Sequence, residues 1–398
     1  MNSRTILFGA FDRHNFGDML FPHVATALLR EKEARFAGVA KRDLSVYGGH
    51  ATEPLALWAH EFTGERIDII HVGGEILTCD AWQAAVMVSS EEEAQRAIAS
   101  YDKDADARLE WGRSLLHTER KIPYVAGKNQ FSKAGACIFC GVGGVELANL
   151  APSFRDEVLT TLKEADYLGV RDRLTMRSLA EQGIDAKLVP DPAVMADALF
   201  GDRIRRHGRE GEPARVRTAF PGGYLAVQFS ADFGDDVTLR VLAEQLDHVV
   251  SENGMGLVLF RAGAAPWHDD REVFRRLAPL LHRSTPWLFE SLNLWDICAL
   301  IAGSRGYCGS SLHGRIVATA YALPRLNIIH PRLVGMPSKQ EAYARTWDEA
   351  EPAVVGVERL AAEMSKAMAE NTAARQETSD RLCALYRQSA NEWIRLLA

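Results

Sequence analysis

The chain has 398 residues, of which 47% are hydrophobic and 25% charged, close to an average globular protein. This composition excludes a largely disordered or collagen-like chain, and the length predicts two or three domains. With 46 Lys and Arg against 53 Asp and Glu, the net charge is -7, which excludes general nucleic-acid binding because that needs a basic field. No apolar run has the length of a membrane span, and the N-terminus lacks the pattern of a signal peptide, so we expect a cytoplasmic protein without an integral membrane segment.

The N-terminal half alternates apolar, strand-like runs with helical stretches, which is typical of parallel βαβ units. The first strand, at 5–9, leads into a turn and then a helix over 19–30. Further strands are predicted at 67–72, 122–125, 136–141, 167–170 and 187–189. The acidic, helical stretch 89–116 interrupts the alternation and indicates an insertion.

A segment rich in charge and glycine, 201–221, is predicted to be a linker, and the alternation restarts after it. Strands are predicted at 224–229, 257–260, 287–289, 306–309 and 325–329, and helices at 236–251, 270–281, 294–302 and 312–321. The sequence therefore predicts an α/β protein with Rossmann-like domains at 1–200 and 222–350 and a helical tail at 351–398.

Open α/β sheets bind ligands at the carboxyl ends of their strands, so a cleft between two such domains is the expected site. The helical tail could fold back onto the first domain or pack against a second subunit, which leaves a homo-oligomer open.

Six cysteines are too few for a disulfide scaffold. Cys137 and Cys140 form a CxxC pair inside a strand-like run, where we expect buried thiols rather than a zinc or redox site. His268-Asp269-Asp270 resembles a set of metal ligands but has no third partner in view, so we interpret it as a helix start.

Two turns of the first domain carry candidate acceptor chemistry. In Asn15-Phe-Gly17-Asp18 the carboxylate of Asp18 can take a proton or a hydroxyl hydrogen bond, or it can simply cap the helix. After the next strand, Gly73-Gly74 allows close approach of a ligand or a neighbouring loop, or forms a plain tight turn. Glu75 lies just beyond that turn.

Arg171 follows another strand of the first domain, a position that suits a carboxylate or phosphate. The alternative is a structural pair with Asp172 or Asp191. The strongest candidate is Cys308-Gly-Ser-Ser-Leu-His313-Gly-Arg315, where His313 begins a helix and is placed to donate a proton. A buried capping histidine is the other interpretation.

These motifs together resemble the polysaccharide pyruvyl transferase family, in order over about residues 5–345. The matching segments are Asn15-Phe-Gly17-Asp18, Gly73-Gly74, Arg171-Asp172, Val189-Pro190-Asp191-Pro192, Leu312-His313-Gly314, Leu323-Pro324 and Lys339. The resemblance implies a glycosyltransferase-B-like fold, two Rossmann-like domains facing across a cleft.

The resemblance also implies transfer of pyruvate from phosphoenolpyruvate to a sugar, a glycan or a lipid-linked saccharide, as in exopolysaccharide biosynthesis. The product is a pyruvate ketal and phosphate is released. Phosphoenolpyruvate is a co-substrate, and no cofactor or metal is needed. The roles implied are catalysis by His313 and Asp18, donor binding by Arg171, Arg315, Ser310, Ser311, Leu312 and Lys339, and acceptor binding by Asn15, Gly17, Gly74 and Glu75.

One position departs from the family pattern, which carries arginine immediately before the Leu-His pair. Ser311 stands there, so we expect either that Arg315 replaces the missing charge or that the donor differs or catalysis is lost. A nucleotide-sugar glycosyltransferase of the same architecture and a non-catalytic sugar-binding homologue are the alternatives.

Overall fold

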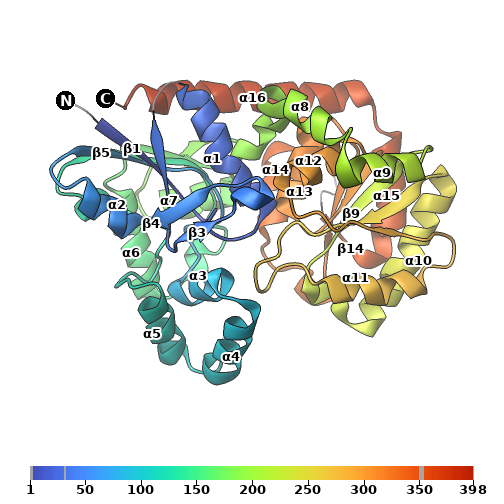
Figure 1. Cartoon of the computed structure of the whole chain (residues 1–398), viewed down its shortest axis with the longest axis horizontal. Helices are drawn as coiled ribbons and strands as arrows, with labels where there is room; N and C mark the ends of the chain where they lie inside the picture. Colours follow the sequence, from blue (N-terminus) through green and yellow to red (C-terminus); the bar gives the residue numbers. More distant parts are fainter. Residues whose placement is uncertain (1–2, 31–32, 349–353, 398) are drawn as a thin grey trace. The chain divides into compact units, whose positions relative to one another are not determined.

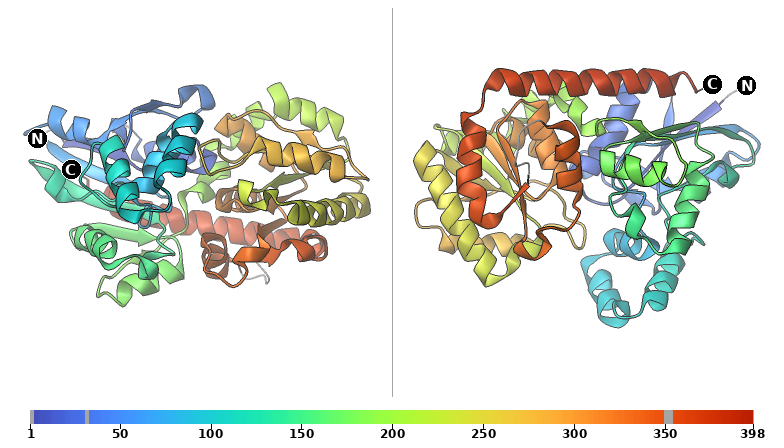
Figure 2. Two further views of the ribbon diagram at one scale, coloured as in Figure 1. Left: turned by 90° about the horizontal axis from the view of Figure 1, so that it is seen from below. Right: turned by 180° about the vertical axis from the view of Figure 1, so that it is seen from behind.

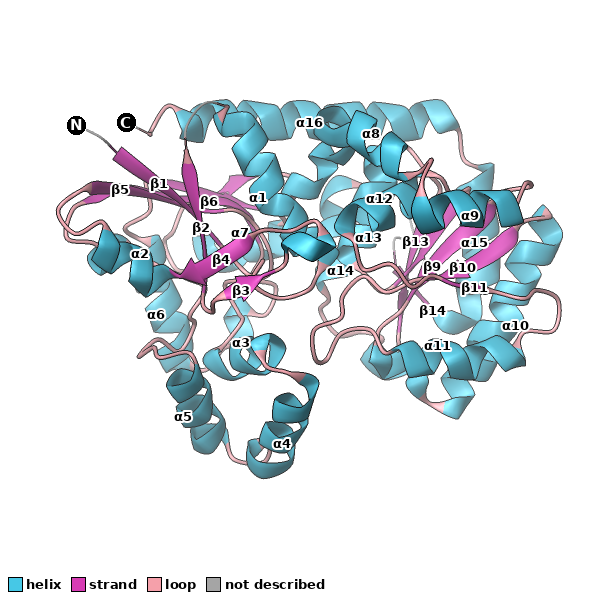
Figure 3. Cartoon of the chain, viewed as in Figure 1, coloured by secondary structure: helices cyan, strands magenta, loops and turns pink. Residues whose placement is uncertain are grey.

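The computed structural model describes residues 3–30, 33–348 and 354–397, which divide into two compact units (Figure 1). Unit 1 comprises Met1–Pro192 together with Leu385–Ala398, and unit 2 comprises Ala193–Ala384. In each unit the strands lie side by side with helices around them (Figure 3). Both units therefore have the α/β layering predicted from the sequence.

Over its described residues, unit 1 contains a sheet of eight strands in the order β3-β4-β2-β1-β5-β6-β7-β8. The strands are β1 (Ser3–Phe8), β2 (Ala34–Gly38), β3 (Arg42–Asp43), β4 (Ala51–Pro54), β5 (Arg66–His71), β6 (Ala134–Val142), β7 (Tyr167–Val170) and β8 (Lys187–Leu188). Neighbouring strands are parallel except β3 and β4. The central strands are nearly continuous apolar runs, because a parallel sheet covered by helices is buried on both faces.

The helices of unit 1 include a group that forms a small core of its own. The helices are α1 (Phe16–Leu29), α2 (Leu55–Glu61), α3 (Ala81–Val88), α4 (Glu91–Tyr101), α5 (Ala105–Leu115), α6 (Pro152–Leu162) and α7 (Arg173–Ala180). The rings of Trp82 on α3 and Trp111 on α5 pack edge to face, with Ala94 and Ala97 of α4 buried beside them. Figure 2 shows these three helices, in cyan to teal, grouped together within unit 1. The predicted insertion at 89–116 is thus the pair α4 and α5.

Unit 2, where described, contains a six-stranded sheet in the order β11-β10-β9-β12-β13-β14, with parallel pairing. The strands are β9 (Tyr224–Gln228), β10 (Gly256–Leu259), β11 (Trp287–Leu288), β12 (Gly306–Gly309), β13 (Arg325–Ile329) and β14 (Val354–Gly356). The helices are α8 (Ala196–His207), α9 (Gly211–Ala219), α10 (Asp236–Asn253), α11 (Arg271–Leu277), α12 (Leu294–Ala302), α13 (Leu312–Ala320), α14 (Lys339–Trp347), α15 (Leu360–Ala369) and α16 (Thr372–Ile394). Helix α10 packs with α11 and α15, whereas α8, α9, α12 and α13 form a second packed group.

Each sheet has one point at which the strand order reverses. In unit 1, β1 pairs with β2 on one side and β5 on the other. In unit 2, β9 pairs with β10 on one side and β12 on the other. The carboxyl ends of β1 and β5, and of β9 and β12, are therefore the topological switch points, where open α/β sheets bind ligands.

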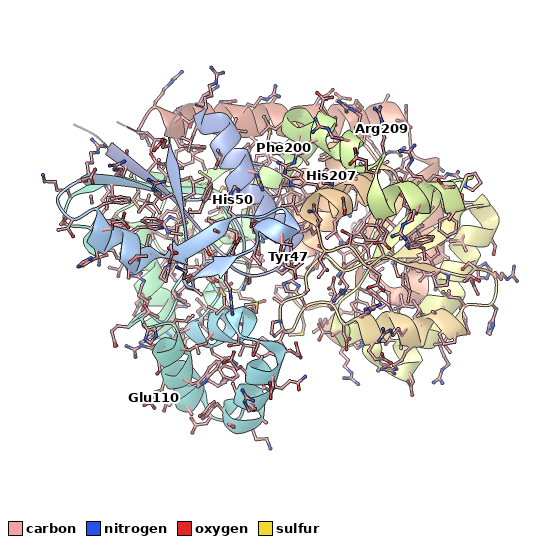
Figure 4. All side chains as sticks on the ribbon, in the orientation of Figure 1. Tyr47, His50, Glu110, Phe200, His207 and Arg209 are labelled. Atoms are coloured by element: carbon pink, nitrogen blue, oxygen red, sulfur yellow. The ribbon has the colours of Figure 1, made fainter. Side chains whose placement is uncertain are left out.

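The segment predicted to be a linker, 201–221, is largely helical. Helix α8 begins before it and α9 lies inside it, and the unit boundary falls earlier, between Pro192 and Ala193. The ring of Phe200 packs against Trp295, and the Nδ1 atom of His207 lies 2.7 Å from Asp296, so α8 is tied to α12. Figure 4 labels Phe200 and His207 on α8. The prediction failed because most charges of this segment lie on the exposed faces of two short helices, while Glu212 is buried and accepts hydrogen bonds from Trp287 and Ser291.

The predicted strand at 122–125 is also wrong. Ile122, Tyr124 and Val125 are fully buried but lie in an irregular turn, so burial rather than sheet pairing explains the apolar run. Two other predictions are confirmed. Cys137 and Cys140 are buried in β6, where burial raises the pKa of Cys137 to about 12, and Asp270 is the N-cap of α11.

The described part of the tail is helical, as predicted, over α15 and α16, although β14 precedes them as an added edge strand. The end of α16 belongs to unit 1. There the hydroxyl of Tyr167 on β7 lies 2.7 Å from that of Ser389, and Lys187 on β8 forms an ion pair with Glu392 at 2.5 Å. The end of the tail thus packs on the first domain, one of the placements that the sequence left open, whereas α15 and the first part of α16 belong to unit 2.

Candidate functional site

Asn15 and Asp18 lie at the switch point of unit 1, where β1 leads into α1. Asn15 is the N-cap: its side-chain oxygen accepts hydrogen bonds from the backbone nitrogens of Gly17 at 3.0 Å and Asp18 at 3.4 Å. Asp18 is therefore not the cap that the sequence allowed. Its carboxylate is buried in the first turn of α1, where the positive helix end favours a negative charge.

The Gly73-Gly74 turn after β5 lies beside Asp18. Both glycines have positive φ, 126° and 95°, which disfavours any other residue. A Cβ atom added to Gly74 would lie 3.4 Å from Oδ1 of Asp18, so this turn and the carboxylate are in close proximity. The structure thus brings together Asn15, Gly17, Asp18 and Gly74.

Sequence reasoning missed a cluster of three buried side chains, Asp12, Arg13 and Tyr124, of which Arg13 reaches Asp18. The carboxylate of Asp12 accepts hydrogen bonds from the backbone nitrogens of Val39 and Ala40 and from the hydroxyl of Tyr124. The guanidinium of Arg13 lies over the ring of Tyr124 and 3.6 Å from Oδ2 of Asp18. The signal available in the sequence was the Asp12-Arg13 pair, two charges directly after a buried apolar strand.

Arg171 lies in a buried ion-pair network. Its guanidinium donates to Oε2 of Glu75 at 2.6 Å and to Oδ2 of Asp191 at 2.8 Å, and the side chain is almost fully buried. Burial lowers the pKa of Arg171, but the two carboxylates more than reverse this and hold it above its usual value. The partner Asp191 is the structural alternative that the sequence left open.

This network joins the carboxyl ends of four strands. Glu75 follows β5, Arg171 follows β7 and Asp191 follows β8, while Oε1 of Glu75 accepts from the nitrogen of Val145 after β6 at 2.7 Å. Arg171 and Glu75 therefore hold the loops around the switch point. Their charges are already engaged with each other, which differs from the direct substrate contacts expected from the sequence.

In unit 2, the predicted Ser-Ser-Leu-His turn lies at the switch point, directly after β12. Ser311 is the N-cap of α13, and its hydroxyl accepts from the nitrogen of Gly314 at 3.2 Å. Leu312 and His313 form the first turn of α13, and the side chain of His313 is 7% exposed. Since Ser311 provides the cap, the capping interpretation of His313 is not the one observed.

Ser310 and Ser311 are tied to β9 as well as β12. The nitrogen of Ser310 donates to the backbone oxygen of Gln228 at 3.1 Å, and the nitrogen of Ser230 donates to the hydroxyl of Ser310 at 3.0 Å. The nitrogen of Ser311 donates to Oε1 of Gln228 at 2.7 Å. The turn is therefore held by hydrogen bonds to the end of β9 as well as by its own strand, β12.

Arg315 does not replace the arginine missing at Ser311 in the way expected from the sequence. Its Nε and Nη2 atoms both donate to Oδ2 of Asp348, at 2.8 Å and 2.5 Å, and Arg325 donates to Oδ1 at 2.6 Å. Although burial opposes ionisation of Asp348, the two arginines lower the pKa of its carboxyl to about 2. Arg315 is therefore engaged in a buried pair, whereas Lys339 is exposed at the start of α14.

Solved structures with the same two-unit architecture are UDP-N-acetylglucosamine 2-epimerases. A putative one from Listeria monocytogenes is 12% identical with a TM-score of 0.52, covering 98% of this chain and 93% of that chain. The enzyme from Methanocaldococcus jannaschii, in complex with UDP-GlcNAc and UDP, is 10% identical with a TM-score of 0.50, covering 93% and 94%. These likenesses show the fold: this is an α/β protein of the glycosyltransferase-B type with a C-terminal helix, as predicted.

The sequence comparison identifies a narrower class of protein than the fold does. The chain belongs to the polysaccharide pyruvyl transferase family, whose model matches residues 15–330. That match includes Asp18, Arg171 and His313. No curated protein matches the sequence. Among the described residues, no helix combines the length and apolar character of a membrane span.

Proposed function

We propose that this chain transfers pyruvate from phosphoenolpyruvate to a sugar or glycan acceptor, forming a pyruvate ketal and releasing phosphate. The membership in a transferase family supports the reaction class. The observation that carries the proposal is the position of His313, in the first turn of α13 directly after the switch-point strand β12. A histidine in that place can deliver a proton to a bound anion.

In the proposed reaction His313 is the general acid. It donates its proton to the methylene carbon of phosphoenolpyruvate, which becomes a methyl group and leaves C2 electrophilic. One acceptor hydroxyl attacks C2 and a second hydroxyl closes the ring as the C–O bond to phosphate breaks. Asp18 accepts the proton of one attacking hydroxyl, and the leaving phosphate takes the proton of the other, so that it departs as hydrogen phosphate. Proton exchange with solvent then returns Asp18 and His313 to their starting states.

The donor is an anion, so its proposed contacts are those of unit 2 that favour negative charge. Ser310, Ser311 and Leu312 lie at the positive end of α13, and Lys339 supplies an exposed ammonium group. We assign Arg171 and Arg315 to holding the loops, since each guanidinium already binds a buried carboxylate. This assignment replaces the direct donor contact expected from the sequence.

The acceptor contacts proposed are in unit 1. Asn15 and Gly17 shape the start of α1, and Gly74 leaves the space beside the Asp18 carboxylate open to a hydroxyl. Glu75 acts through Arg171 by fixing the turn after β5. No metal or cofactor enters these steps.

Calorimetric titration with phosphoenolpyruvate and with UDP-GlcNAc tests the proposal without knowledge of the acceptor. Saturable binding of phosphoenolpyruvate that UDP-GlcNAc does not displace is the expected result. Lys339→Ala should weaken that binding severalfold, whereas Lys163→Ala, at the exposed C-cap of α6 in unit 1, should leave it unchanged. Binding of UDP-GlcNAc without binding of phosphoenolpyruvate would instead indicate a nucleotide-sugar enzyme.

A further inference from the structure

A buried polar chain runs beneath the Ser311 turn of unit 2. Nε2 of Gln228 donates to Oδ1 of Asp269 at 2.7 Å, and Oε1 of the same amide accepts from the nitrogen of Ser311 at 2.7 Å. The other oxygen of Asp269 accepts from the nitrogen of Ala262 at 2.5 Å. Gln228 and Asp269 are 2% and 8% exposed, so this chain is cut off from bulk water.

The partners of Gln228 fix the orientation of its amide. The nitrogen of Ser311 can only donate, so it requires the amide oxygen; an ionised Asp269 can only accept, so it requires the amide nitrogen. The carbonyl oxygen of Ser311 is held from the other side, by the hydroxyl of Tyr307 at 3.0 Å and Nδ2 of Asn327 at 3.2 Å. The peptide groups around Ser311 are thus set by side chains that do not belong to the turn.

The surroundings of Asp269 make its charge sensitive to pH. Burial raises the pKa of Asp269 to about 7, against the opposing effects of the donors at Ala262, Gln228 and Gly263 and of the nearby charge of Arg261. Tyr307 on β12 is a further titratable group that faces Asp269, and burial raises its pKa well above its usual value, so that it stays neutral.

We propose that Asp269 and Gln228 are positioning residues that act as a proton-sensitive relay, setting the donor-binding turn at Ser311 and His313 according to the charge on Asp269. The ligand controlled in this way is the anionic donor, and in that respect the inference rests on the proposed function. Neither side chain is a catalytic residue, since both act through the backbone of Ser311.

The two charge states of Asp269 require opposite orientations of the Gln228 amide. A protonated Asp269 carries an O–H group, which needs an acceptor and therefore favours the amide oxygen. The amide nitrogen then faces the nitrogen of Ser311, and that buried donor loses its partner. Protonation of Asp269 is accordingly coupled to loss of the hydrogen bond that holds the turn.

The test compares phosphoenolpyruvate binding in the wild type and Asp269→Asn over a range of pH. The neutral amide of the variant imitates the protonated acid. The affinity of Asp269→Asn for phosphoenolpyruvate should therefore be roughly fivefold to tenfold lower than that of the wild type at about pH 8, and equal to it at about pH 5.5. The double variant Asp269→Asn with Gln228→Glu reverses the acid and the amide. It restores an acceptor for the Ser311 nitrogen, and its affinity at about pH 8 should return to within about twofold of the wild type.

Asp247→Asn is the matched control. Asp247 is also a buried carboxylate that accepts from backbone nitrogens, those of His282 at 2.6 Å and Arg283 at 3.1 Å, but it lies on α10 outside the turn. Its substitution should leave the pH dependence of binding unchanged. An Asp269→Asn variant that follows the wild-type pH profile, or a double variant that binds no better than Asp269→Asn, would overturn the relay.

The amide resonance of Ser311 gives a readout that needs no ligand and no variant. In the wild-type protein its ¹H and ¹⁵N shifts should titrate with a midpoint near neutral pH, because its acceptor changes with the charge on Asp269. A Ser311 resonance that stays constant across this range would refute the relay even if phosphoenolpyruvate binds. If phosphoenolpyruvate does not bind but the Ser311 resonance titrates, the proposed donor is wrong and the relay stands.

Discussion

Asp348 illustrates how single residues hold the candidate site in place. Its side chain is 4% exposed, and its two oxygens bind Arg315 on α13 and Arg325 on β13. Removing one partner from a buried ion pair leaves an uncompensated charge, which costs far more than losing a pair at the surface. The pair therefore fixes the start of α13 relative to the neighbouring strand.

The acid stability of the protein should depend on Asp348. Its pKa is about 2 in the folded state and about 3.8 when unfolded, so its contribution is complete above about pH 4 and is lost as the pH falls through about 2. This loss should amount to about 2 kcal/mol of unfolding free energy. Chemical denaturation at several pH values measures it.

Asp348→Asn should lower the free energy of unfolding by about 3–5 kcal/mol at neutral pH and by less near pH 2, where the wild type has lost the same charge. Asp202→Asn is the control, because its pair with Arg205 is 95% exposed on the Asp202 side and an exposed pair contributes little. A pH-independent difference between Asp348→Asn and the wild type would show that the carboxylate is not ionised in the fold.

At the level of single elements, the first turn of α13 depends on close contact between the backbone of Gly314 and the ring of Tyr307. A Cβ atom added to Gly314 would run into the ring of Tyr307, a rigid group that is fully buried. Gly314→Ala should therefore cost about 1–3 kcal/mol of unfolding free energy and shift the Ser311 turn, because the core cannot absorb an extra methyl group there.

Gly208→Ala provides the matched control for that substitution. Gly208 is the C-cap of α8 with φ of -64°, and an added Cβ would meet its nearest neighbour at an ordinary 3.4 Å. Thermal unfolding of the two variants should differ clearly, with Gly208→Ala equal to the wild type or slightly more stable. Equal losses in both would mean that the close packing of Tyr307 on the turn is not a constraint.

The elements predicted best from the sequence are short apolar runs bounded by turn residues. β7, β12 and β13 and the helix α12 have the predicted bounds, because their burial and their sequence pattern coincide. β2 was missed because only its last two residues are buried, so its sequence carries no apolar run. The helices α8 and α9 were missed because few of their residues are buried, Ile204 and Val216 among them.

The sequence predicts which strand ends carry the candidate residues, but not which side chains bind to each other. Asp18, Gly74 and His313 follow strands that the sequence identifies, and the carboxyl ends of those strands fall at the two switch points. The pair of Arg171 with Asp191 was one of the alternatives that the sequence offered. The pair of Arg171 with Glu75 could not be predicted, because the two residues lie 96 residues apart and nothing in the sequence around either one identifies the other. Asp269 and Gln228 were hidden for the same reason, 41 residues apart.

At the scale of the whole molecule, α16 links the two units through a continuous helix, since its last residues belong to unit 1 and its first to unit 2. Trp393, fully buried near its end, belongs to unit 1. Trp393→Ala should cost about 3–5 kcal/mol of unfolding free energy, whereas Leu396→Ala, at a 40% exposed position, should cost less than about 1 kcal/mol.

Hydrogen exchange measures which of the two units loses stability in Trp393→Ala. In Trp393→Ala, the amides of β7 and β8 should exchange faster, because Ser389 and Glu392 anchor this end of α16 to those strands. The amides of β12 and β13 in unit 2 should keep the exchange rates of the wild type. Faster exchange in both units would contradict the assignment of the helix end to unit 1.

The central claim is that His313 drives pyruvyl transfer from phosphoenolpyruvate. The most direct measurement is phosphate release from phosphoenolpyruvate in the presence of a panel of glycans, compared between the wild type and His313→Ala. We predict release that depends on the glycan and yields a ketal with one pyruvate, reduced in His313→Ala by roughly 10²–10⁴-fold, the usual contribution of a general acid. Equal phosphate release by both proteins, or release of a nucleotide from UDP-GlcNAc with none of phosphate from phosphoenolpyruvate, would contradict it.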